Sequence, residues 1–450
     1  MKLKLKPVAG SIVAPQGFLA AGVFCDIKRL GTGKGSNKGK KRDLTLIVSK
    51  TEATVAGMFT TNQICAAPVK VCVSRVAKGI AQAIVVNSGN ANACTGRQGM
   101  RDALAMTATT ESALGIASGR ALVGSTGRIG VLLPLKNVHA GIRAAAERLG
   151  ATPEHGNQAA EAIMTSDSRP KQMAVEFLLG GKKVRLGGIC KGAGMIQPGM
   201  SDTGARPAAV PAGLHATMLC FVTTDAAIEA AALQAALREA VAHSFNRITV
   251  DGDMSTNDTV LVMANGQAGN RRLKKTTQSA TASFKLFQAA LQHVCLELAR
   301  MIVRDGEGVH RVVTVRVSGA HSAADADAAA RSVANSSLVK TSWYGGDPNW
   351  GRIIDALGYS PALIVEDRVD IGYSTPGSRR ITWSLRRGQP TKTPFATLWK
   401  AVQPQEFDLH IRLNLGRGEA LMYAADLTEK YVDFNKGTLA DPSQAASLGG

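Results

Sequence analysis

The chain has 450 residues, 45% of them hydrophobic and 19% charged, which is typical of a soluble globular enzyme and allows two or three domains or one large two-layer unit. Only 4% of the residues are aromatic and 47 are glycine, a mixture that suits close backbone packing and tight turns. The net charge of +19 raises the question of nucleic-acid binding. Because this charge is spread along the whole chain, we expect a basic surface that attracts anionic metabolites, and no nucleic acid as partner.

The densest basic cluster lies in the segment GTGKGSNKGKKRD (31–43). No aromatic residue is interleaved with its lysines, so a stacking platform for single strands is missing. The segment matches GxxxxGK[ST] in no register, and its GxG lacks the third glycine of a dinucleotide-binding loop. We therefore interpret it as a flexible surface loop.

The cysteines and the N-terminal segment bear on the compartment. The seven cysteines are scattered and never spaced as CxxC, which argues against a disulfide framework or a zinc ribbon and indicates a reducing compartment. The segment MKLKLKPVAGSIVAPQGF has neither the apolar stretch of a signal peptide nor the pattern of a transit peptide. No run reaches the ~18 apolar residues of a membrane helix. We therefore expect a cytoplasmic protein without a membrane partner.

Short apolar or alternating runs predict strands, and apolar residues at helical spacing predict helices. The expected elements are, in chain order, strands at 44–49 and 83–86 with further strand character at 56–74, a helix at 101–117, a strand and Gly-rich turn at 121–130, a helix at 138–150, a hairpin at 177–196, a helix at 228–245, a strand–turn–strand at 248–266, a helix at 283–308, a strand at 311–320, a helix at 322–334 and strands at 409–425. This irregular alternation predicts an α+β fold with sheets sandwiched between helix layers.

Common catalytic patterns are missing. The eight histidines form no pair at ligand spacing, so neither HExxH nor HxH exists and no metal is expected. DGDMSTND (251–258) lacks the ligand order and the distal glutamate of an EF-hand loop, and we interpret it as a polar structural turn. No GxSxG motif supports a Ser-His-Asp triad.

Thr217 heads an apolar, strand-like run in HATMLCFV (215–222). It can be read as an ordinary β-branched residue that begins a buried strand, or as a nucleophile. Cleavage between Ala216 and Thr217 would free an α-amine with a pKa near ~8, which can act as the base for the neighbouring hydroxyl. The small Ala216 leaves room for the strained turn that such an internal attack requires. These residues alone leave both interpretations open.

A wider set of motifs decides in favour of the nucleophile. They are VVNSGNANACTG (85–96), STGRIG (125–130), IMTSDSRPK (163–171), KGAGMIQPGM (191–200), ATML (216–219), VDGDMSTNDTV (250–260), RDGEG (304–308) and DPNWGRI (347–353). Through these motifs, in this order and over nearly the whole chain, the sequence resembles the ornithine acetyltransferase (glutamate N-acetyltransferase) family of arginine biosynthesis. The resemblance implies an αββα sandwich of the kind found in ornithine acetyltransferases and the DmpA-like aminopeptidases.

The resemblance also implies that the chain cuts itself before Thr217. The products would be an alpha chain (1–216) and a beta chain (217–450) that stay one folded unit and pair as an α2β2 heterotetramer. Thr217 would take acetyl from N2-acetylornithine and pass it to glutamate in a ping-pong reaction. No cofactor is implied, and the use of acetyl-CoA as a co-substrate stays open.

The family motifs also imply roles for individual residues. Thr126 and Gly127 match the oxyanion-hole positions, where preorganised donors stabilise the tetrahedral intermediate. The substrate-binding positions are matched by Thr165, by Lys191 for a carboxylate, by Glu307 for the side-chain amine and by Asn435 near the C-terminus.

The sequence departs from the family at three places: an insertion at 201–215 immediately before the cleavage site, Arg128 where an apolar residue is usual, and an atypical C-terminal segment. The first bears on self-cleavage and the other two on substrate choice. Three alternatives therefore remain open. They are an amidase or aminopeptidase-type hydrolase on the same scaffold, a diverged paralogue that acts on another amino acid, and an uncleaved basic binding protein.

Overall fold

The computed structural model describes residues 3–28, 41–205, 218–274 and 282–436. It divides into two compact units. The described residues up to Asn246, together with those from Asp253 to Ile302, form unit 1. The segment Arg247–Gly252 and the described residues from Val303 onwards form unit 2.

Unit 1 is built on a sheet with ten strands among the described residues. Its main path runs in the order β1-β6-β7-β9-β11-β3-β4-β5, and β2 and β8 pair with β3 off this path. The strands are β1 (Lys6–Pro7), β2 (Phe18–Val23), β3 (Leu44–Thr60), β4 (Ile80–Asn90), β5 (Ala121–Arg128), β6 (Lys171–Leu179), β7 (Lys182–Lys191), β8 (Met200–Ser201), β9 (Leu219–Thr224) and β11 (Thr259–Ala264).

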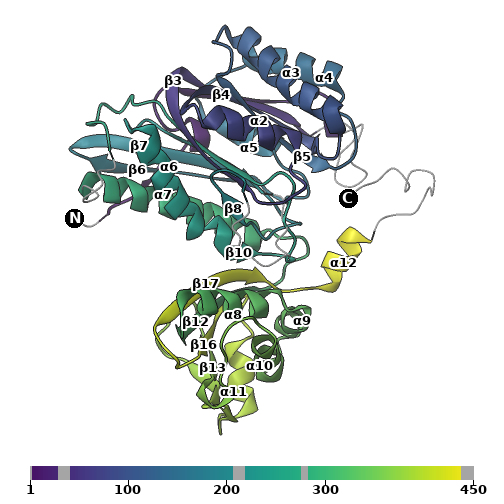
Figure 1. Cartoon of the computed structure of the whole chain (residues 1–450), viewed down its shortest axis with the longest axis vertical. Coiled ribbons are helices and arrows are strands. Elements are labelled where there is room, and N and C mark those ends of the chain that lie inside the picture. Colours follow the sequence, from purple (N-terminus) through teal and green to yellow (C-terminus); the bar gives the residue numbers. More distant parts are fainter. Residues whose placement is uncertain (1–2, 29–40, 206–217, 275–281, 437–450) are drawn as a thin grey trace. The chain divides into compact units, whose positions relative to one another are not determined.

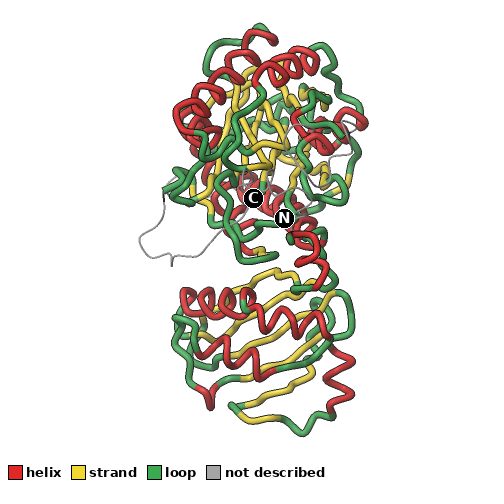
Figure 2. Tube along the Cα trace, turned by 90° about the vertical axis from the view of Figure 1, so that its right-hand side faces the viewer, coloured by secondary structure: helices red, strands yellow, loops and turns green. Residues whose placement is uncertain are grey.

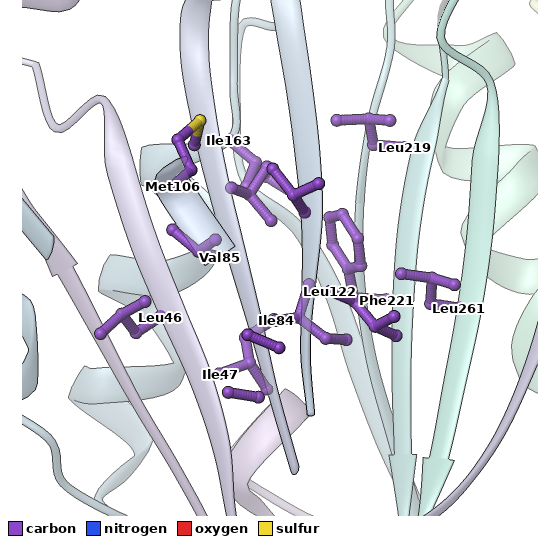
Figure 3. Close-up of a cluster of buried hydrophobic side chains, with 14 of the residues drawn as sticks. Leu46, Ile47, Ile84, Val85, Met106, Leu122, Ile163, Leu219, Phe221 and Leu261 are labelled. Carbon is purple, nitrogen blue, oxygen red and sulfur yellow. The ribbon is translucent and has the colours of Figure 1, made fainter. Parts of the chain in front are cut away.

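This sheet folds over on itself, because β3 is long enough to take part in two halves. The first part of β3 pairs with β2 and β4, and its second part pairs with β11. A Cβ on Gly124 of β5 would lie only 3.2 Å from the ring of Phe221 of β9, although three strands separate β5 from β9 along the sheet. Figure 3 shows the core between the halves, with Ile84, Leu122, Phe221 and Leu261 on the inner side.

Helices cover the outer faces of the two halves (Figure 1). The Cys72 thiol of α2 contacts the backbone of Val123 in β5, and Met106 of α3 lies beside Val85 of β4 in Figure 3. On the other side, Leu298 of α7 packs on Gly188 of β7. The helices of this unit are α2 (Ala67–Val76), α3 (Gly96–Leu114), α4 (Leu135–Ala146), α5 (Pro153–Ala162), α6 (Ala230–Ala242) and α7 (Ala282–Arg304). The layers follow the order helix, sheet, sheet, helix.

Unit 2 has its own sheet, in which seven strands are described, in the order β10-β17-β12-β16-β13-β14-β15. In β12, Val313, Val315 and Val317 are buried in one core cluster with the alanines of α8, whereas the intervening residues are partly exposed, as expected of a strand covered on one face (Figure 2). The elements are β10 (Ile248–Thr249), β12 (Val312–Ala320), α8 (Ala323–Asn335), α9 (Ser337–Gly345), α10 (Trp350–Gly358), β13 (Asp370–Ser374), β14 (Thr382–Arg386), β15 (Gln389–Pro390), α11 (Phe395–Ala401), β16 (Glu406–Arg412), β17 (Gly418–Ala425) and α12 (Glu429–Asn435).

The predicted α+β fold and its αββα layering are confirmed. One local prediction is wrong: the segment 67–76, assigned strand character because of its valines, is helix α2, which begins with a proline in its first turn and packs on β5. The predicted chain boundary at 216/217 lies outside the described residues and stays a prediction. It does not coincide with the division into units, since β9 from the second segment pairs with β7 from the first inside unit 1.

Helix α7 is long and apolar enough to cross a membrane by length and composition, and it is the one such helix in the described part of the chain. Half of the relevant stretch is buried inside the molecule. The core helix of a soluble protein meets the same criterion, so this helix is weak evidence for a membrane span.

Candidate active site

The Gly-rich turn at the end of β5 has a backbone that only glycine can adopt. Strand β5 runs parallel to β4, with Thr126 opposite Ser88 and Gly127 opposite Gly89. Gly127 has φ +130°, and a Cβ there would lie 2.3 Å from the carbonyl carbon of Gly89. Glycine therefore lets the two strands approach closely and leaves Thr126 fully buried beside the turn.

Lys191 brings two of the predicted site residues together. It is the last residue of β7 and is almost completely buried. Its Nζ donates to Thr165 Oγ1 at 2.7 Å and to Thr126 Oγ1 at 3.3 Å. The structure thus gathers Thr126, Gly127, Thr165 and Lys191 in unit 1 from three separate segments, as one cluster of a cation and two hydroxyls.

Asp167 holds the backbone segments that carry Thr165 and Lys191. Its carboxylate accepts hydrogen bonds from the backbone N–H of Thr165 at 2.9 Å and of Gly192 at 2.7 Å, and it pairs with the buried Lys171 at 2.6 Å. Burial would raise the pKa of Asp167, but Lys171, Lys191 and the Gly192 N–H outweigh it and hold the pKa well below its usual range. An ionised Asp167 therefore fixes both segments that carry the predicted binding residues.

Asn257 ties the turn of β5 to the polar segment before β11. Its side-chain nitrogen donates to the carbonyl oxygens of Ala91 at 2.7 Å and Ser125 at 2.8 Å. Sequence analysis interpreted 251–258 as a structural turn and gave Asn257 no role. No local pattern in the sequence signalled this role, because it depends on the pairing of strands that are far apart in the chain.

The next residue, Asp258, holds the head of β9. Its Oδ1 accepts a hydrogen bond of 2.5 Å from the backbone N–H of Met218. Burial raises the pKa of Asp258 well above its usual range, against the opposing effects of the Met218 N–H and Lys191. Ala216 and Thr217, the predicted cleavage site, lie outside the described residues, as do 206–215 of the insertion and most of the basic segment 31–43.

The remaining two predicted residues meet in unit 2. Asn435 of α12 donates through Nδ2 to Glu307 Oε2 at 2.9 Å. Tyr431 of the same helix donates its hydroxyl to Asp251 at 3.3 Å. Gly308, with φ +68°, permits this packing, because a Cβ there would lie 2.5 Å from the Tyr431 nitrogen. Three motifs that are far apart in sequence thus form one polar cluster.

Arg128, one of the departures from the family, is partly exposed at the end of β5. Burial lowers its pKa from the ordinary value. Within the described residues the side chain of Arg128 has no hydrogen bond or ion pair. Its backbone carbonyl accepts a hydrogen bond of 2.8 Å from the backbone N–H of Ala91. The guanidinium of Arg128 therefore does not stabilise the described part of the fold through a hydrogen bond or an ion pair.

The cluster in unit 1 has the features needed for acyl transfer. A buried cation, two hydroxyls and a glycine turn provide donors for an oxyanion and for a carboxylate. In the described part of the chain, no group of three His, Cys, Asp or Glu side chains is arranged to hold a metal ion. Together with the α+β fold, this cluster of donors is suited to acyl transfer.

Comparison with known proteins identifies the family. The model of the ArgJ family matches residues 22–437. The arginine biosynthesis bifunctional protein ArgJ of Symbiobacterium thermophilum is 46% identical over 428 residues, which cover 95% of this chain and 98% of that protein. The chain therefore belongs to the ArgJ family, and it is an acetyltransferase of arginine biosynthesis.

Two solved structures carry related sequences. A crystal structure of ArgJ from Bacillus halodurans is 37% identical and covers 44% of this chain and 98% of its own, with a TM-score of 0.41. Ornithine acetyltransferase from Mycobacterium tuberculosis, solved in complex with ornithine, is 34% identical and covers 44% of this chain and all of its own, with a TM-score of 0.40.

Proposed function

We propose that Thr217, freed by cleavage after Ala216, carries acetyl from N2-acetylornithine to glutamate as an acetyl-enzyme. One observation carries the proposal. Lys191, whose ammonium group contacts Thr126 and Thr165, pairs in register with Leu219 of β9. Leu219 is the first residue of β9 and follows Thr217 by two positions in the sequence. The start of β9 therefore lies beside Lys191, the residue at the centre of the cluster.

The first half-reaction follows from the groups in this cluster. The α-amine of Thr217 takes the proton of its hydroxyl, and the oxygen attacks the acetyl carbonyl. The Thr126 hydroxyl and the Gly127 N–H stabilise the oxyanion. The protonated α-amine then gives its proton to the departing nitrogen as the carbon–nitrogen bond breaks, and ornithine leaves as the amine. Lys191 binds the substrate carboxylate, and Thr165 is a further hydrogen-bonding position. For Glu307 the family motifs imply contact with the side-chain amine, and for Asn435 they imply a contact with substrate. The ornithine complex of the Mycobacterium tuberculosis relative supports this choice of substrate.

In the second half-reaction, the amine of glutamate attacks the acetyl-Thr217 ester, and the bond between the acetyl carbon and the Thr217 oxygen breaks. The α-amine of Thr217 transfers the proton of the attacking amine to that oxygen, and N-acetylglutamate leaves. The nucleophile, its base and the oxyanion donors all come from the chain, so the proposal requires no metal ion or prosthetic group. Acetyl-CoA as a second acetyl donor is part of the proposal, in keeping with the bifunctional name of the relatives. An assay for acetylglutamate with acetyl-CoA as the sole donor tests it.

We also propose that the alpha chain (1–216) and the beta chain (217–450) stay associated and pair as an α2β2 heterotetramer in the cytoplasm. Strand β9 of the second segment pairs with β7 of the first and with β11, which supports a shared fold after cleavage. Light scattering of the purified protein tests the tetramer, and localisation of a tagged chain tests the compartment.

The intact mass of the purified protein, measured beside Thr217→Ala, tests the nucleophile. We expect two fragments split between Ala216 and Thr217 for the wild type, and one full-length chain for the variant. Acetyl-labelled N2-acetylornithine and glutamate are then supplied to the split protein. Label on glutamate supports the transferase, label in free acetate indicates the hydrolase, and a wild-type chain that stays whole overturns the proposed nucleophile.

A further inference from the structure

Unit 1 contains a pocket that is lined by none of the residues of the candidate active site. Its volume is about 560 Å³, within the range of roughly 300–1,000 Å³ that is usual for small-molecule sites. Its walls come from the end of β2, the residues just before β3, the segment after α4, and α5. The lining includes Gly22, Phe24, Arg42, Arg148, His155 and Gln158.

Close backbone packing fixes the walls of this pocket. A Cβ on Gly22 of β2 would lie 2.1 Å from the carbonyl oxygen of Gln158, so β2 and α5 approach more closely than a side chain would permit. The ring of His155 lies against Gly150, where a Cβ would be 2.3 Å from Nε2. Gly150 in turn exchanges two backbone hydrogen bonds with Ala20, at 2.9 and 3.1 Å. The pocket is therefore preformed, which lowers the cost of ordering a ligand in it.

Two arginines give the pocket its positive charge. Arg148 is exposed, and among the described residues its guanidinium makes no hydrogen bond or ion pair. Arg42 is oriented by bonds from Nε to the Gly22 carbonyl at 3.2 Å and from Nη1 to Glu161 at 2.7 Å, and its Nη2 has no hydrogen-bond partner in the described part of the chain. Glu161 offsets part of the charge of Arg42, so Arg148 is the stronger attraction for an anion. Guanidinium groups match the geometry of phosphate oxygens.

An aromatic side chain lines the same pocket. Phe24 directly follows β2, and 41% of it is exposed. Its ring offers a face on which a planar ligand can stack. The described lining contains no carboxylate, so a ligand whose main charge is a free amine finds no partner there. Cations beside an aromatic ring instead suit a ligand that combines a phosphate with a planar ring.

We propose that this pocket binds a nucleoside phosphate. Arg148 and Arg42 hold the phosphate oxygens, and the base stacks on Phe24. Free adenine nucleotides and coenzyme A share this chemistry, since both carry adenosine and a diphosphate. The proposal goes beyond the proposed acetyl transfer, because binding in this pocket requires neither Thr217 nor cleavage.

The test is titration calorimetry of the full protein with ADP, coenzyme A and inorganic phosphate as separate probes. We expect a nucleotide to bind more tightly than phosphate, and to bind more weakly as salt is added. Arg148→Met is expected to weaken nucleotide binding by roughly 10- to 100-fold, the effect of losing charge-assisted hydrogen bonds. Arg143→Met is the matched control and is expected to change it by less than about twofold. Arg143 is also exposed, its side chain makes no hydrogen bond or ion pair among the described residues, and it does not line the pocket.

Phe24→Leu tests the contact with the base. This variant keeps an apolar side chain but loses the aromatic face. We expect it to weaken nucleotide binding about tenfold and to leave the binding of inorganic phosphate unchanged. Thermal melting of each variant checks that it folds. The titrations are repeated with Thr217→Ala, for which the same affinities are expected.

Weaker nucleotide binding by Arg148→Met, beside normal binding by Arg143→Met, supports the proposal. Tighter binding of coenzyme A than of ADP then assigns the pocket to the coenzyme, and the reverse order assigns it to a free nucleotide. Failure of both nucleotides to bind at millimolar concentration, or equal effects of the two arginine variants, overturns the proposal. A wild-type chain that never splits but binds nucleotide overturns the proposed nucleophile and leaves this pocket standing.

Discussion

The side chain of Asn257 donates a hydrogen bond of 2.8 Å to the carbonyl oxygen of Ser125. Ser125 directly precedes Thr126 and Gly127, so this bond fixes the turn that we propose to provide the oxyanion donors. Asn257→Ala removes it together with the bond to Ala91. We expect kcat to fall by up to about 100-fold, because a small displacement of catalytic donors is enough for such a loss.

The control for this variant is Asn270→Ala. Asn270 is also buried and donates to two backbone carbonyls, those of Ala227 and Arg271, away from the β5 turn. Both variants are expected to lose about 1–3 kcal/mol of unfolding free energy. Steady-state kinetics and urea denaturation separate the two effects. Equal kcat values for the two variants would contradict a specific role of Asn257.

Gly127 is predicted to tolerate no side chain. Alanine there would have to adopt φ +130° with its Cβ against the Gly89 carbonyl carbon. We expect Gly127→Ala to lose more than about 3 kcal/mol of unfolding free energy and all measurable activity. Gly130→Ala is the matched control, because its φ is +81° but no atom lies within 4 Å of the added Cβ. It is expected to lose about 1–2 kcal/mol and to stay active.

Lys191 and Lys171 both act on Asp167, and Lys191 also contacts the hydroxyls of Thr126 and Thr165. Lys191→Met is expected to raise KM for both amino-acid substrates by roughly 10- to 100-fold, the value of a charge-assisted hydrogen bond to a carboxylate. Lys171→Met is expected to lower the unfolding free energy by about 3–5 kcal/mol and to leave KM nearly unchanged. A comparable rise of KM in both variants would mean that Lys191 acts through Asp167.

Asp167 also predicts a pH effect on stability. Because its pKa is depressed in the folded chain, its contribution to stability is present above the unfolded value of about 4 and is lost as the pH falls through the folded value. Lys171→Met removes the strongest charge that depresses this pKa. We therefore expect acid unfolding of the variant, followed by circular dichroism, to begin at a higher pH than that of the wild type. An unchanged midpoint would show that Asp167 does not control acid unfolding.

Glu307 predicts a difference between the two substrates. N2-acetylornithine has a side-chain amine, whereas glutamate has none. Glu307→Gln is expected to raise KM for N2-acetylornithine about tenfold and to change KM for glutamate much less. The exposed Glu419→Gln in the same unit serves as the charge-matched control. A parallel rise for both substrates would contradict contact between Glu307 and the amine.

Much of the fold was predictable because the elements are strongly periodic. The helices predicted at 101–117 and 283–308 appear as α3 and α7, and the hairpin at 177–196 as β6 and β7. Helix α2 was missed because its β-branched valines favour strands in isolation, and packing on β5 overrides that preference. The second unit was missed because the boundary between the units falls inside α7, where no linker composition marks it.

The candidate site was predictable only through the resemblance to a family. The motifs pointed to Thr126, Gly127, Thr165 and Lys191, and the structure brings these four together. They gave no hint of Asn257 and Asp258. The roles of these two residues depend on the parallel pairing of β9 and β11, which brings the polar segment before β11 next to Met218. Such long-range register is not contained in any local pattern.

Strand β9 lies between β7 and β11, with six paired residues on each side. In the uncut chain this arrangement forms within one molecule, at a rate that does not depend on concentration. After the proposed cut, β7 would belong to one polypeptide and β9 to another, so a denatured enzyme could refold only when two molecules meet. Self-cleavage would thus make folding efficient only before the cut, so that each molecule folds once and does not readily refold after denaturation. The lifetime of the mature enzyme would then be set by how slowly it unfolds.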